Sequence, residues 1–341
     1  MNYNEILEKA RGLVGEVCKA CPVCNGRACG NKMPGPGSKL PDNVAARNYD
    51  KWQEIFVNMD TLCPGAPVDT SFELFGKSFS APIFVAPLGA VQMHYGKLHD
   101  DISYNGILVP AAVNYGICAL TGDGVNAEVM KNAVKNMKAV GGMGIPTIKP
   151  WANEVILEKL DILNEAGVFA AAMDVDGAGL PFLKEEANAD AGPKSVEQLR
   201  EIVEHADMPF IVKGIMTPAG ARKAIEAGAA GIVVSNHGGR VQGCTPSTAE
   251  VLPSIVKAVN GECRVFVDGG IRSGVDVYKA LALGADAVLI GRPLVPFIYA
   301  AGEEGFRVYM DRLVGELRDT MTMCGTPTLK DISEDNIFMA R

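Results

Sequence analysis

Eight short apolar runs recur from residue 81 onward, and helical patterns lie between them. The runs are rich in β-branched residues and apolar on both faces, which is typical of parallel strands that other layers cover. The runs are Ala81–Pro87, Gly116–Thr121, Met143–Lys149, Val168–Asp176, Pro209–Gly214, Gly231–Ser235, Arg264–Asp268 and Ala287–Gly291. Eight strand–helix units predict an α/β fold whose sheet closes into a (β/α)8 barrel, the TIM barrel. An open doubly wound sheet is the alternative, but no Gly-x-Gly-x-x-Gly follows the first run.

The N-terminal part of the chain lacks this alternation of strand and helix patterns. Residues 2–17 place apolar side chains at helical spacing, which predicts an amphipathic helix. Residues 18–41 are rich in cysteine, glycine and proline, which predicts turns and loop. We therefore expect residues 1–46 to form a helix and a Cys/Gly/Pro-rich cap on a barrel made by residues 47–341.

The charge balance narrows the choice of partners. The chain has 341 residues, with 32 basic and 40 acidic side chains and a formal net charge of −8, and it has no cluster of Lys and Arg. This balance argues against a nucleic acid partner and favours solubility. No apolar stretch is long enough to span a bilayer, and the first residues do not resemble a signal peptide. We therefore expect a cytoplasmic protein without a membrane partner.

Glycine and arginine follow the last two runs, at the strand ends where barrels of this class form their sites. Residues 268–272 read Asp-Gly-Gly-Ile-Arg, and residues 291–292 read Gly-Arg. Glycines allow backbone N–H groups to approach an anion closely, and a guanidinium group offers phosphate two donors at once. The two segments therefore predict a phosphate site. The alternative is that the glycines only turn the chain and the arginines pair with surface carboxylates.

His237 is one of four histidines, and it lies in the Ser-Asn-His-Gly-Gly-Arg segment that follows the sixth run. In a barrel, this position faces Lys213 and Asp176 at the ends of two other runs. A histidine base needs a partner that fixes its tautomer, and a carboxylate provides this. With Arg240 as an anion clamp, the group is suited to removing a proton from an anionic substrate. A structural histidine is the alternative.

At these residues the sequence resembles the FMN-dependent α-hydroxy acid oxidases and dehydrogenases, such as glycolate oxidase and lactate oxidase. Residues 235–240 resemble the signature of that family, and residues 265–293 are similar to it almost throughout. The likeness extends over roughly residues 47–338 and is strongest from residue 209 on. The resemblance implies a (β/α)8 barrel that holds FMN at the carboxyl ends of its strands.

The resemblance also implies roles for individual residues. His237 would take a proton from the substrate as hydride passes to the flavin, Asp176 would stabilise the imidazolium, and Arg240 would bind the substrate carboxylate. Lys213 would stabilise negative charge on the reduced flavin. The residues implied to contact FMN are Pro87, Leu88, Gly89, Thr121, Lys213, Ser235, Asp268, Gly269, Gly270, Arg272, Gly291 and Arg292. The implied partners are a small anionic organic substrate, an electron acceptor of a class that the residues leave open, and further copies of the chain in a homo-oligomer, a tetramer by analogy.

The substrate half of the site departs from the family pattern. Ile148 stands where the family has a tyrosine at the end of the third strand, and Leu183 stands where it has an arginine beyond the fourth. Asp174 replaces a threonine that contacts the flavin, and the cysteine-rich segment replaces a stretch that carries a second tyrosine. His94, after the first run, either faces the substrate or packs in a loop. The resemblance thus implies that the flavin half of the site is kept and that the substrate half is rebuilt, which argues against a simple small hydroxy acid as the substrate.

Four of the nine cysteines, Cys18, Cys21, Cys24 and Cys29, fall within twelve residues. Thiolates at this spacing can ligate zinc or an iron–sulfur cluster, and the spacing is close to a ferredoxin run except in its last gap. Inert thiols in a tight loop and a redox-active or substrate-facing pair are the alternatives. Metal binding is the main prediction for this segment, which we expect to cap the barrel mouth.

The leading functional prediction is an FMN-dependent oxidoreductase that transfers hydride from an α-hydroxy acid-like anionic substrate to flavin N5, with His237 as the base. The second is an FMN-dependent isomerase or ene-type reductase that acts on a different substrate. The third is a flavin- or metal-binding protein without catalysis. The presence of His237, Lys213 and Arg240 favours an enzyme.

Overall fold

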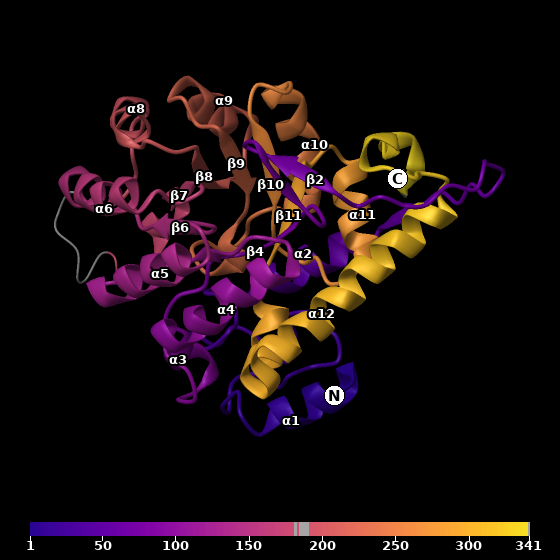
Figure 1. The fold of residues 1–341 in the computed structure, drawn as a ribbon, viewed down its shortest axis with the longest axis horizontal. Helices are drawn as coiled ribbons and strands as arrows, with labels where there is room; N and C mark the ends of the chain where they lie inside the picture. Colours follow the sequence, from indigo (N-terminus) through magenta and orange to yellow (C-terminus); the bar gives the residue numbers. More distant parts are fainter. Residues whose placement is uncertain (181–182, 184–190, 340–341) are drawn as a thin grey trace.

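A computed structural model of the chain describes residues 1–180, 183 and 191–339. Its centre is a sheet of eight parallel strands in the order β4-β11-β10-β9-β8-β7-β6-β5 (Figure 1). The strands are β4 (Ile83–Val85), β5 (Leu120–Thr121), β6 (Ile145–Ile148), β7 (Ala171–Asp174), β8 (Phe210–Ile215), β9 (Gly231–Val234), β10 (Arg264–Val267) and β11 (Ala287–Ile290). A parallel bridge between Val85 and Ala119, beside β5, closes the sheet into a barrel.

Helices follow the strands and cover the outside of the barrel (Figure 1). They are α4 (Asp101–Tyr115), α5 (Ala127–Ala139), α6 (Asn153–Ala166), α8 (Val196–His205), α9 (Pro218–Glu226), α10 (Thr248–Val259), α11 (Gly274–Ala282) and α12 (Val295–Met323). Several begin at a capping box; at α10, Ser247 and Glu250 each accept a hydrogen bond from the other's backbone N–H. Each predicted run coincides with one strand to within a few residues, so the (β/α)8 barrel is confirmed and the doubly wound alternative is wrong.

Alternation along the strands explains why polar side chains gather at one end of the barrel. Successive side chains of a strand point to opposite faces, so the residue two positions beyond an interior residue also points inward. Ile211 and Phe266 belong to the apolar interior and are almost fully buried. The next inward positions on their strands are Lys213 and Asp268. The carboxyl ends of the strands therefore carry the charged groups, above an apolar core.

An aromatic cluster closes the amino end of the barrel. The hairpin of β2 (Phe72–Leu74) and β3 (Lys77–Phe79) pairs antiparallel beneath the strands. Phe84 of β4 meets the rings of Phe72 and Phe79 edge to face, with centroids 6.1 and 5.0 Å apart. Because these rings fill the amino end, the space for a ligand lies at the carboxyl end.

The N-terminal helix is shorter than the sequence predicts. It is α1 (Tyr3–Arg11), and it packs on α12 through the rings of Tyr3 and Phe297, whose centroids are 4.6 Å apart. The prediction of a helix over residues 2–17 is wrong in its length, because the chain turns at Gly12 and takes a φ of +71° at Gly15.

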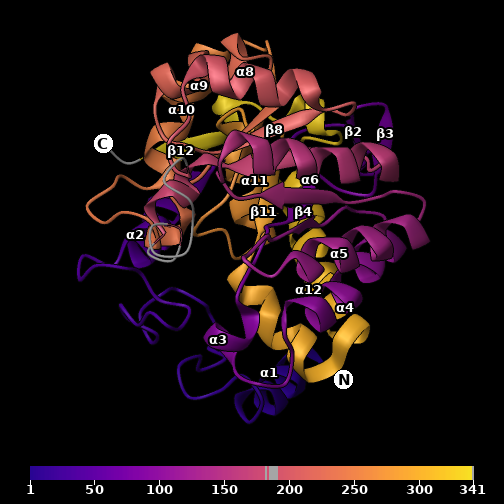
Figure 2. The ribbon, with the colours of Figure 1, turned by 90° about the vertical axis from the view of Figure 1, so that its left-hand side faces the viewer.

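The cysteine-rich region has the loop structure that its composition predicts. Residues 12–43 contain only turns, bends and irregular backbone, and α2 (Val44–Gln53) follows them. Figure 2 shows this loop, in indigo, between α1, α2 and α3 (Val91–Tyr95). The loop thus lies beside the segment that follows β4.

Smaller elements complete the chain. A pair of antiparallel strands, β1 (Ile55–Val57) and β12 (Ile337–Met339), lies outside the barrel. Short 3-10 turns are η1 (Val175–Gly179), η2 (His237–Gly239), η3 (Arg292–Leu294), η4 (Leu329–Asp331) and η5 (Glu334–Asn336). Within the described ranges, no helix has the length and apolar character needed to cross a bilayer.

We expect Phe84→Ala to lower the free energy of unfolding by about 3–5 kcal/mol, because it empties a ring-sized space in the fully buried floor of the barrel. Urea denaturation measures this cost as a lower transition midpoint. Phe56→Ala is the matched control, since Phe56 is 53% exposed, and its change should be within about 0.5 kcal/mol. Equal midpoints for the two variants would contradict the packing described for the floor.

Candidate active site

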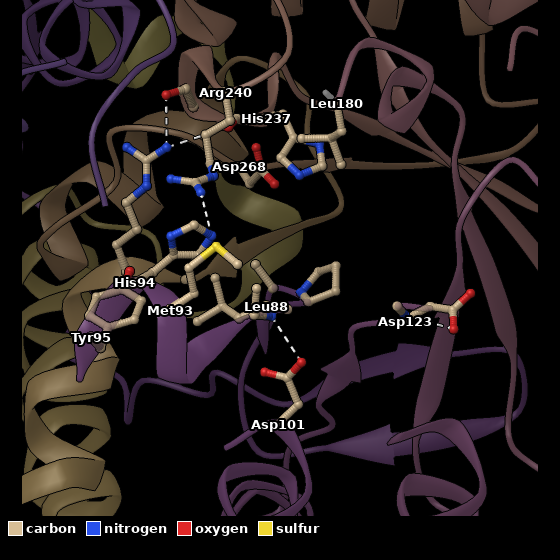
Figure 3. A pocket seen from close by; sticks show the side chains of 18 of the residues that line it. Leu88, Met93, His94, Tyr95, Asp101, Asp123, Leu180, His237, Arg240 and Asp268 are labelled. Atoms are coloured by element: carbon tan, nitrogen blue, oxygen red, sulfur yellow. Dashed lines mark hydrogen bonds between the residues drawn. The ribbon is translucent and has the colours of Figure 1, made fainter. Parts of the chain in front are cut away.

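A cavity of about 670 Å³ opens at the carboxyl ends of the strands (Figure 3). It brings together most of the site residues that the sequence predicts. Those that line it are Pro87, Leu88, Gly89, Lys213, His237, Arg240, Asp268, Gly269, Gly270, Arg272, Gly291 and Arg292. Asp176, Thr121 and Ser235 do not line it. Asp176 lies behind His237, Ser235 accepts a hydrogen bond from Lys213, and Thr121 is buried in β5.

The glycine and arginine residues form one corner of this cavity. Gly270 has a φ of +85°, and a side chain there would place its Cβ 2.3 Å from the backbone oxygen of Asn48, so only glycine fits. The N–H groups of Gly269, Gly270 and Gly291 donate to no acceptor within the described residues. Arg272 completes the corner from the loop before α11. Free N–H groups beside a guanidinium are the donors that a phosphate requires.

The base predicted from the sequence has the geometry of a proton acceptor. His237 Nδ1 lies 3.1 Å from Asp176 Oδ1, and His237 takes a φ of +55° in the turn after β9. An ionised carboxylate only accepts hydrogen bonds, so Nδ1 carries the proton and Nε2 is left with a free lone pair. Because His237 lines the cavity, that lone pair is available to a ligand.

The surroundings of this pair keep His237 neutral and Asp176 ionised. Burial lowers the pKa of His237 and outweighs the opposite effect of Asp176, so the imidazole is neutral near pH 7. Burial opposes the charge of Asp176, but His237 and Lys213 outweigh burial and lower its pKa. An ionised carboxylate is thus held behind a neutral imidazole, which stabilises the imidazolium that proton transfer creates.

Lys213 supplies a buried positive charge at the cavity. Its Nζ donates to Ser235 Oγ at 3.0 Å and lies 3.6 Å from Asp268 Oδ2. Burial alone would lower the pKa of Lys213, but the carboxylates of Asp268 and Asp176 outweigh burial and raise it. The ammonium group is therefore charged and fixed in position.

Arg240 is held by the N-terminal loop. Its Nη1 donates to the carbonyl oxygens of Gly35 and Gly37 at 2.8 and 3.2 Å, and its Nη2 lies 2.8 Å from His94 Nε2. Figure 3 shows the guanidinium of Arg240 and the ring of His94 meeting in the cavity. The other ring nitrogen of His94, Nδ1, faces the N–H of Gly35 at 3.0 Å. The loop that the sequence predicts as a cap thus reaches Arg240, the residue predicted to bind an anion.

The contacts of His94 cannot all be hydrogen bonds. Burial and the charge of Arg240 lower its pKa to about 3, so the ring is neutral and carries one N–H. Both of its nitrogens face donors, the guanidinium of Arg240 and the N–H of Gly35. In one of the two contacts, two N–H groups therefore point at each other without an acceptor between them. An anion between Arg240 and His94 would accept from both and remove this repulsion.

Two further groups at the cavity, Asp123 and Asn48, were not predicted from the sequence. Asp123, after β5, accepts hydrogen bonds from the backbone of Lys149 and from the side chains of Trp151 and Lys159. Its place in a Gly-Asp-Gly segment at a strand end was a usable signal. Asn48 of α2 exchanges amide hydrogen bonds with Asn236 at 2.8 and 2.9 Å, which ties α2 to the end of β9. No local pattern marked Asn48.

The three residues that depart from the family pattern at the strand ends, Ile148, Asp174 and Leu183, do not line the cavity. Ile148 and Leu183 are buried. Asp174 forms an ion pair with Lys149. Leu180 reaches the wall, where Figure 3 shows it beside His237. Ile148, Leu183 and Asp174 therefore add no side chain to the lining of the cavity.

Within the described residues, one group of at least three side chains brings its metal-binding atoms within 4.8 Å of one another: Asp174, Asp176 and His237. Lys149 already pairs with Asp174, and Lys213 lies close enough to lower the pKa of Asp176, so this group is a network of charges around His237. The four N-terminal cysteines do not bring three sulfur atoms that close together. All nine cysteines are unpaired thiols.

Comparison with known proteins places this site in a family. A family profile described as FMN-dependent dehydrogenase matches residues 38–180 and 166–339. The chain is 34% identical to the 4-hydroxymandelate oxidase of Amycolatopsis orientalis, with 88% of this chain and 92% of that protein covered. It is 46% identical to an L-lactate oxidase of Roseobacter sp. (strain GAI101), with 96% and 84% covered. A solved structure of mandelate oxidase is similar, with a TM-score of 0.77 at 28% identity and coverages of 96% and 95%.

The matched residues include the whole barrel, the glycine–arginine corner and the segment around His237. The predictions of a flavoprotein, of FMN as cofactor and of an oxidoreductase are confirmed, and the comparisons support neither an isomerase or ene-type reductase nor a protein without catalysis. The chain belongs to the family of FMN-dependent α-hydroxy acid oxidases and dehydrogenases.

Proposed function

We propose that the protein oxidises an anionic α-hydroxy acid at the carbon that bears the hydroxyl group, with His237 as the base. The observation that carries this proposal is the pair of His237 and Asp176, whose free imidazole nitrogen faces the same cavity as the phosphate corner. A base and a cofactor site that share one cavity allow proton and hydride to leave the same substrate.

The residues present fit FMN. The unpaired N–H groups of Gly269, Gly270 and Gly291 suit its phosphate, together with Arg272 and Arg292. Residues 87–89 offer backbone and Leu88 offers an apolar surface to a flat ring at the cavity wall, and Lys213 offers a buried positive charge. Bound FMN supplies the hydride acceptor.

The chain's own residues move the proton. Arg240 binds the substrate carboxylate and so directs the hydroxyl group toward His237 Nε2. His237 takes the hydroxyl proton as the hydrogen on the α-carbon leaves as hydride, and a keto acid remains. Asp176 holds Nδ1–H throughout and stabilises the imidazolium.

His94 takes part in binding the carboxylate. A carboxylate between Arg240 and His94 accepts from the guanidinium and from Nε2–H, which removes the donor–donor conflict described above. Apolar side chains in the cavity lining, among them Met93, Val125 and Leu180, favour a substrate side chain larger than that of a small hydroxy acid. We therefore propose an α-hydroxy acid with an apolar substituent as the substrate class.

Further proposals concern the domain organisation, the cellular location, the oligomeric state and the electron acceptor. We propose that residues 1–46 form a cap on a barrel of residues 47–341, supported by the contacts of Gly35 and Gly37 with Arg240. We propose a cytoplasmic location, supported by nine unpaired thiols, which suit a reducing compartment. We propose a homo-oligomer, in line with the family resemblance, and an electron acceptor separate from the substrate.

His237→Ala removes the proton acceptor, so anaerobic bleaching of the flavin by an α-hydroxy acid should slow by about a hundredfold or more. Stopped-flow absorbance measures the rate, and the flavin content shows that the cofactor is still bound. His205→Ala is the matched control, because His205 lies on α8 outside the cavity, and it should bleach at the wild-type rate. Fast bleaching in His237→Ala would remove His237 from the mechanism, and wild-type protein that no hydroxy acid bleaches would contradict the proposed function.

The pH dependence follows from the lowered pKa of His237. The base works when neutral, so kcat/KM should stay level as the pH falls to about 6.5 and decrease only below that value, the ordinary pKa of histidine. In Asp176→Asn the charge that raises this pKa is gone, so the acid limb should move to still lower pH and the rate should fall about a hundredfold. An acid limb above pH 6.5 in the wild type, or an upward shift in the variant, contradicts this assignment.

His94→Phe keeps a ring of similar size and removes the second carboxylate donor. We expect KM for the hydroxy acid to rise about tenfold with kcat within about threefold of the wild type, because a hydrogen bond to a charged group is lost. Steady-state kinetics measure both constants. The matched control is His99→Phe, which changes a histidine that does not line the cavity and should leave KM unchanged. An unchanged or lower KM in His94→Phe would show that His94 only occupies Arg240 in the absence of substrate.

A further inference from the structure

We propose that Cys18, Cys21, Cys24 and Cys29 bind an iron–sulfur cluster that fastens the N-terminal loop over the FMN site. The four thiols lie in one loop, and the other five cysteines lie outside it. Each of the four is partly buried, as Cys263 is, whereas Cys63 and Cys244 are exposed and Cys118 and Cys324 are buried. The proposal concerns a second site and does not depend on which substrate the enzyme oxidises.

The four thiols lie near one another in space as well as in sequence. Each of their six pairings is close enough for a direct electrostatic interaction. The N–H of Ala20 hydrogen-bonds the sulfur of Cys18, and N–H bonds to sulfur are among the contacts that stabilise cluster thiolates. Arg11 and Lys19 lie near Cys21, and Arg292 lies near Cys29, so three positively charged side chains lie close to the thiols.

The first part of the loop, which carries Cys18, Cys21 and Cys24, has little backbone structure to hold it in place. No backbone N–H of residues 15–24 donates to another backbone group within the described chain, whereas residues 25–39 form several such hydrogen bonds. The position of residues 15–24 therefore depends on contacts other than backbone hydrogen bonds. Four metal–thiolate bonds provide such contacts, since a bound metal contributes its binding free energy to folding of the segment.

The separation of the sulfur atoms favours a cluster over a single zinc ion. Zinc–sulfur bonds of about 2.3 Å in a tetrahedron place the four sulfurs about 3.8 Å apart. No three of these sulfurs lie within 4.8 Å of one another. A cluster of several iron atoms spreads its four thiolates more widely, and all four ligands here come from one short stretch, as in ferredoxin runs.

The position of the loop gives the cluster a consequence for the active site. The backbone oxygen of Cys24 accepts from Nε of Arg272 at 2.5 Å, which connects the thiol loop directly to the phosphate corner. Farther along, Gly35 and Gly37 hold Arg240. Loss of the cluster therefore loosens the loop that positions one arginine for the FMN phosphate and another for the substrate.

The first test is chemical analysis of the wild-type full-length chain, purified without oxygen and reconstituted with ferrous iron and sulfide. We expect iron and acid-labile sulfide in equal amounts, beyond the flavin, and an electron paramagnetic resonance signal after reduction with dithionite. Absence of iron and sulfide after reconstitution would overturn the proposal, and so would one zinc ion per chain without sulfide.

The second test compares Cys21→Ser with Cys63→Ser, a matched change at an exposed cysteine outside the loop. We expect Cys21→Ser to lose the cluster signal and to bind FMN about tenfold more weakly, and Cys63→Ser to keep both. Circular dichroism shows whether each variant is folded. Iron and sulfide retained by Cys21→Ser would overturn the ligand assignment. Flavin bleaching by a hydroxy acid in the wild type is read separately, so failure of the proposed function and failure of the cluster proposal remain distinguishable.

Discussion

Alternation of side chains along closed parallel strands is the constraint on which the site depends. The register of β7 and β8 pairs Asp174 with Lys213, and β9 places Val234 opposite Val267, one residue before Ser235 and Asp268. Because the strands are closed into a barrel, these inward side chains form one layer at the carboxyl ends of the strands, next to the apolar interior. The aromatic floor at Phe84 excludes a ligand from the other end.

The buried charges at the carboxyl ends of the strands suit the proposed reaction but contribute little to the stability of the fold. The side chains of Lys213 and Asp174 are only 4% and 2% exposed, and removing such groups from water is costly even when they are paired. In return, the charges are fixed before substrate binds and do not need to reorganise during the reaction. His237 is neutral because burial and the charge of Lys213 lower its pKa, while Asp176 beside it stays ionised.

Much of the fold and half of the site could be predicted from the sequence, because both depend on local order along the chain. Runs of β-branched residues identify strands, and the residues directly after a parallel strand must lie at the mouth, so His237, Lys213 and Arg292 were within reach. The partners of Arg240 were not, because Gly35, Gly37 and His94 reach it from loops whose course depends on long-range packing. The end of α1 was misjudged because apolar spacing continued past Gly12 and Gly15, where the backbone turns.

In the proposed mechanism, Arg240 binds the substrate carboxylate and so places the hydroxyl group at His237. Two crystal structures of the FMN-loaded protein test this placement. One is the slow His237→Ala variant with a bound α-hydroxy acid, and the other is the wild type with a keto acid. We expect the carboxylate between Arg240 and His94, and the oxygen on the α-carbon within hydrogen-bond distance of Nε2 in the wild type. A carboxylate bound away from Arg240, or an α-carbon oxygen turned away from His237, would contradict it.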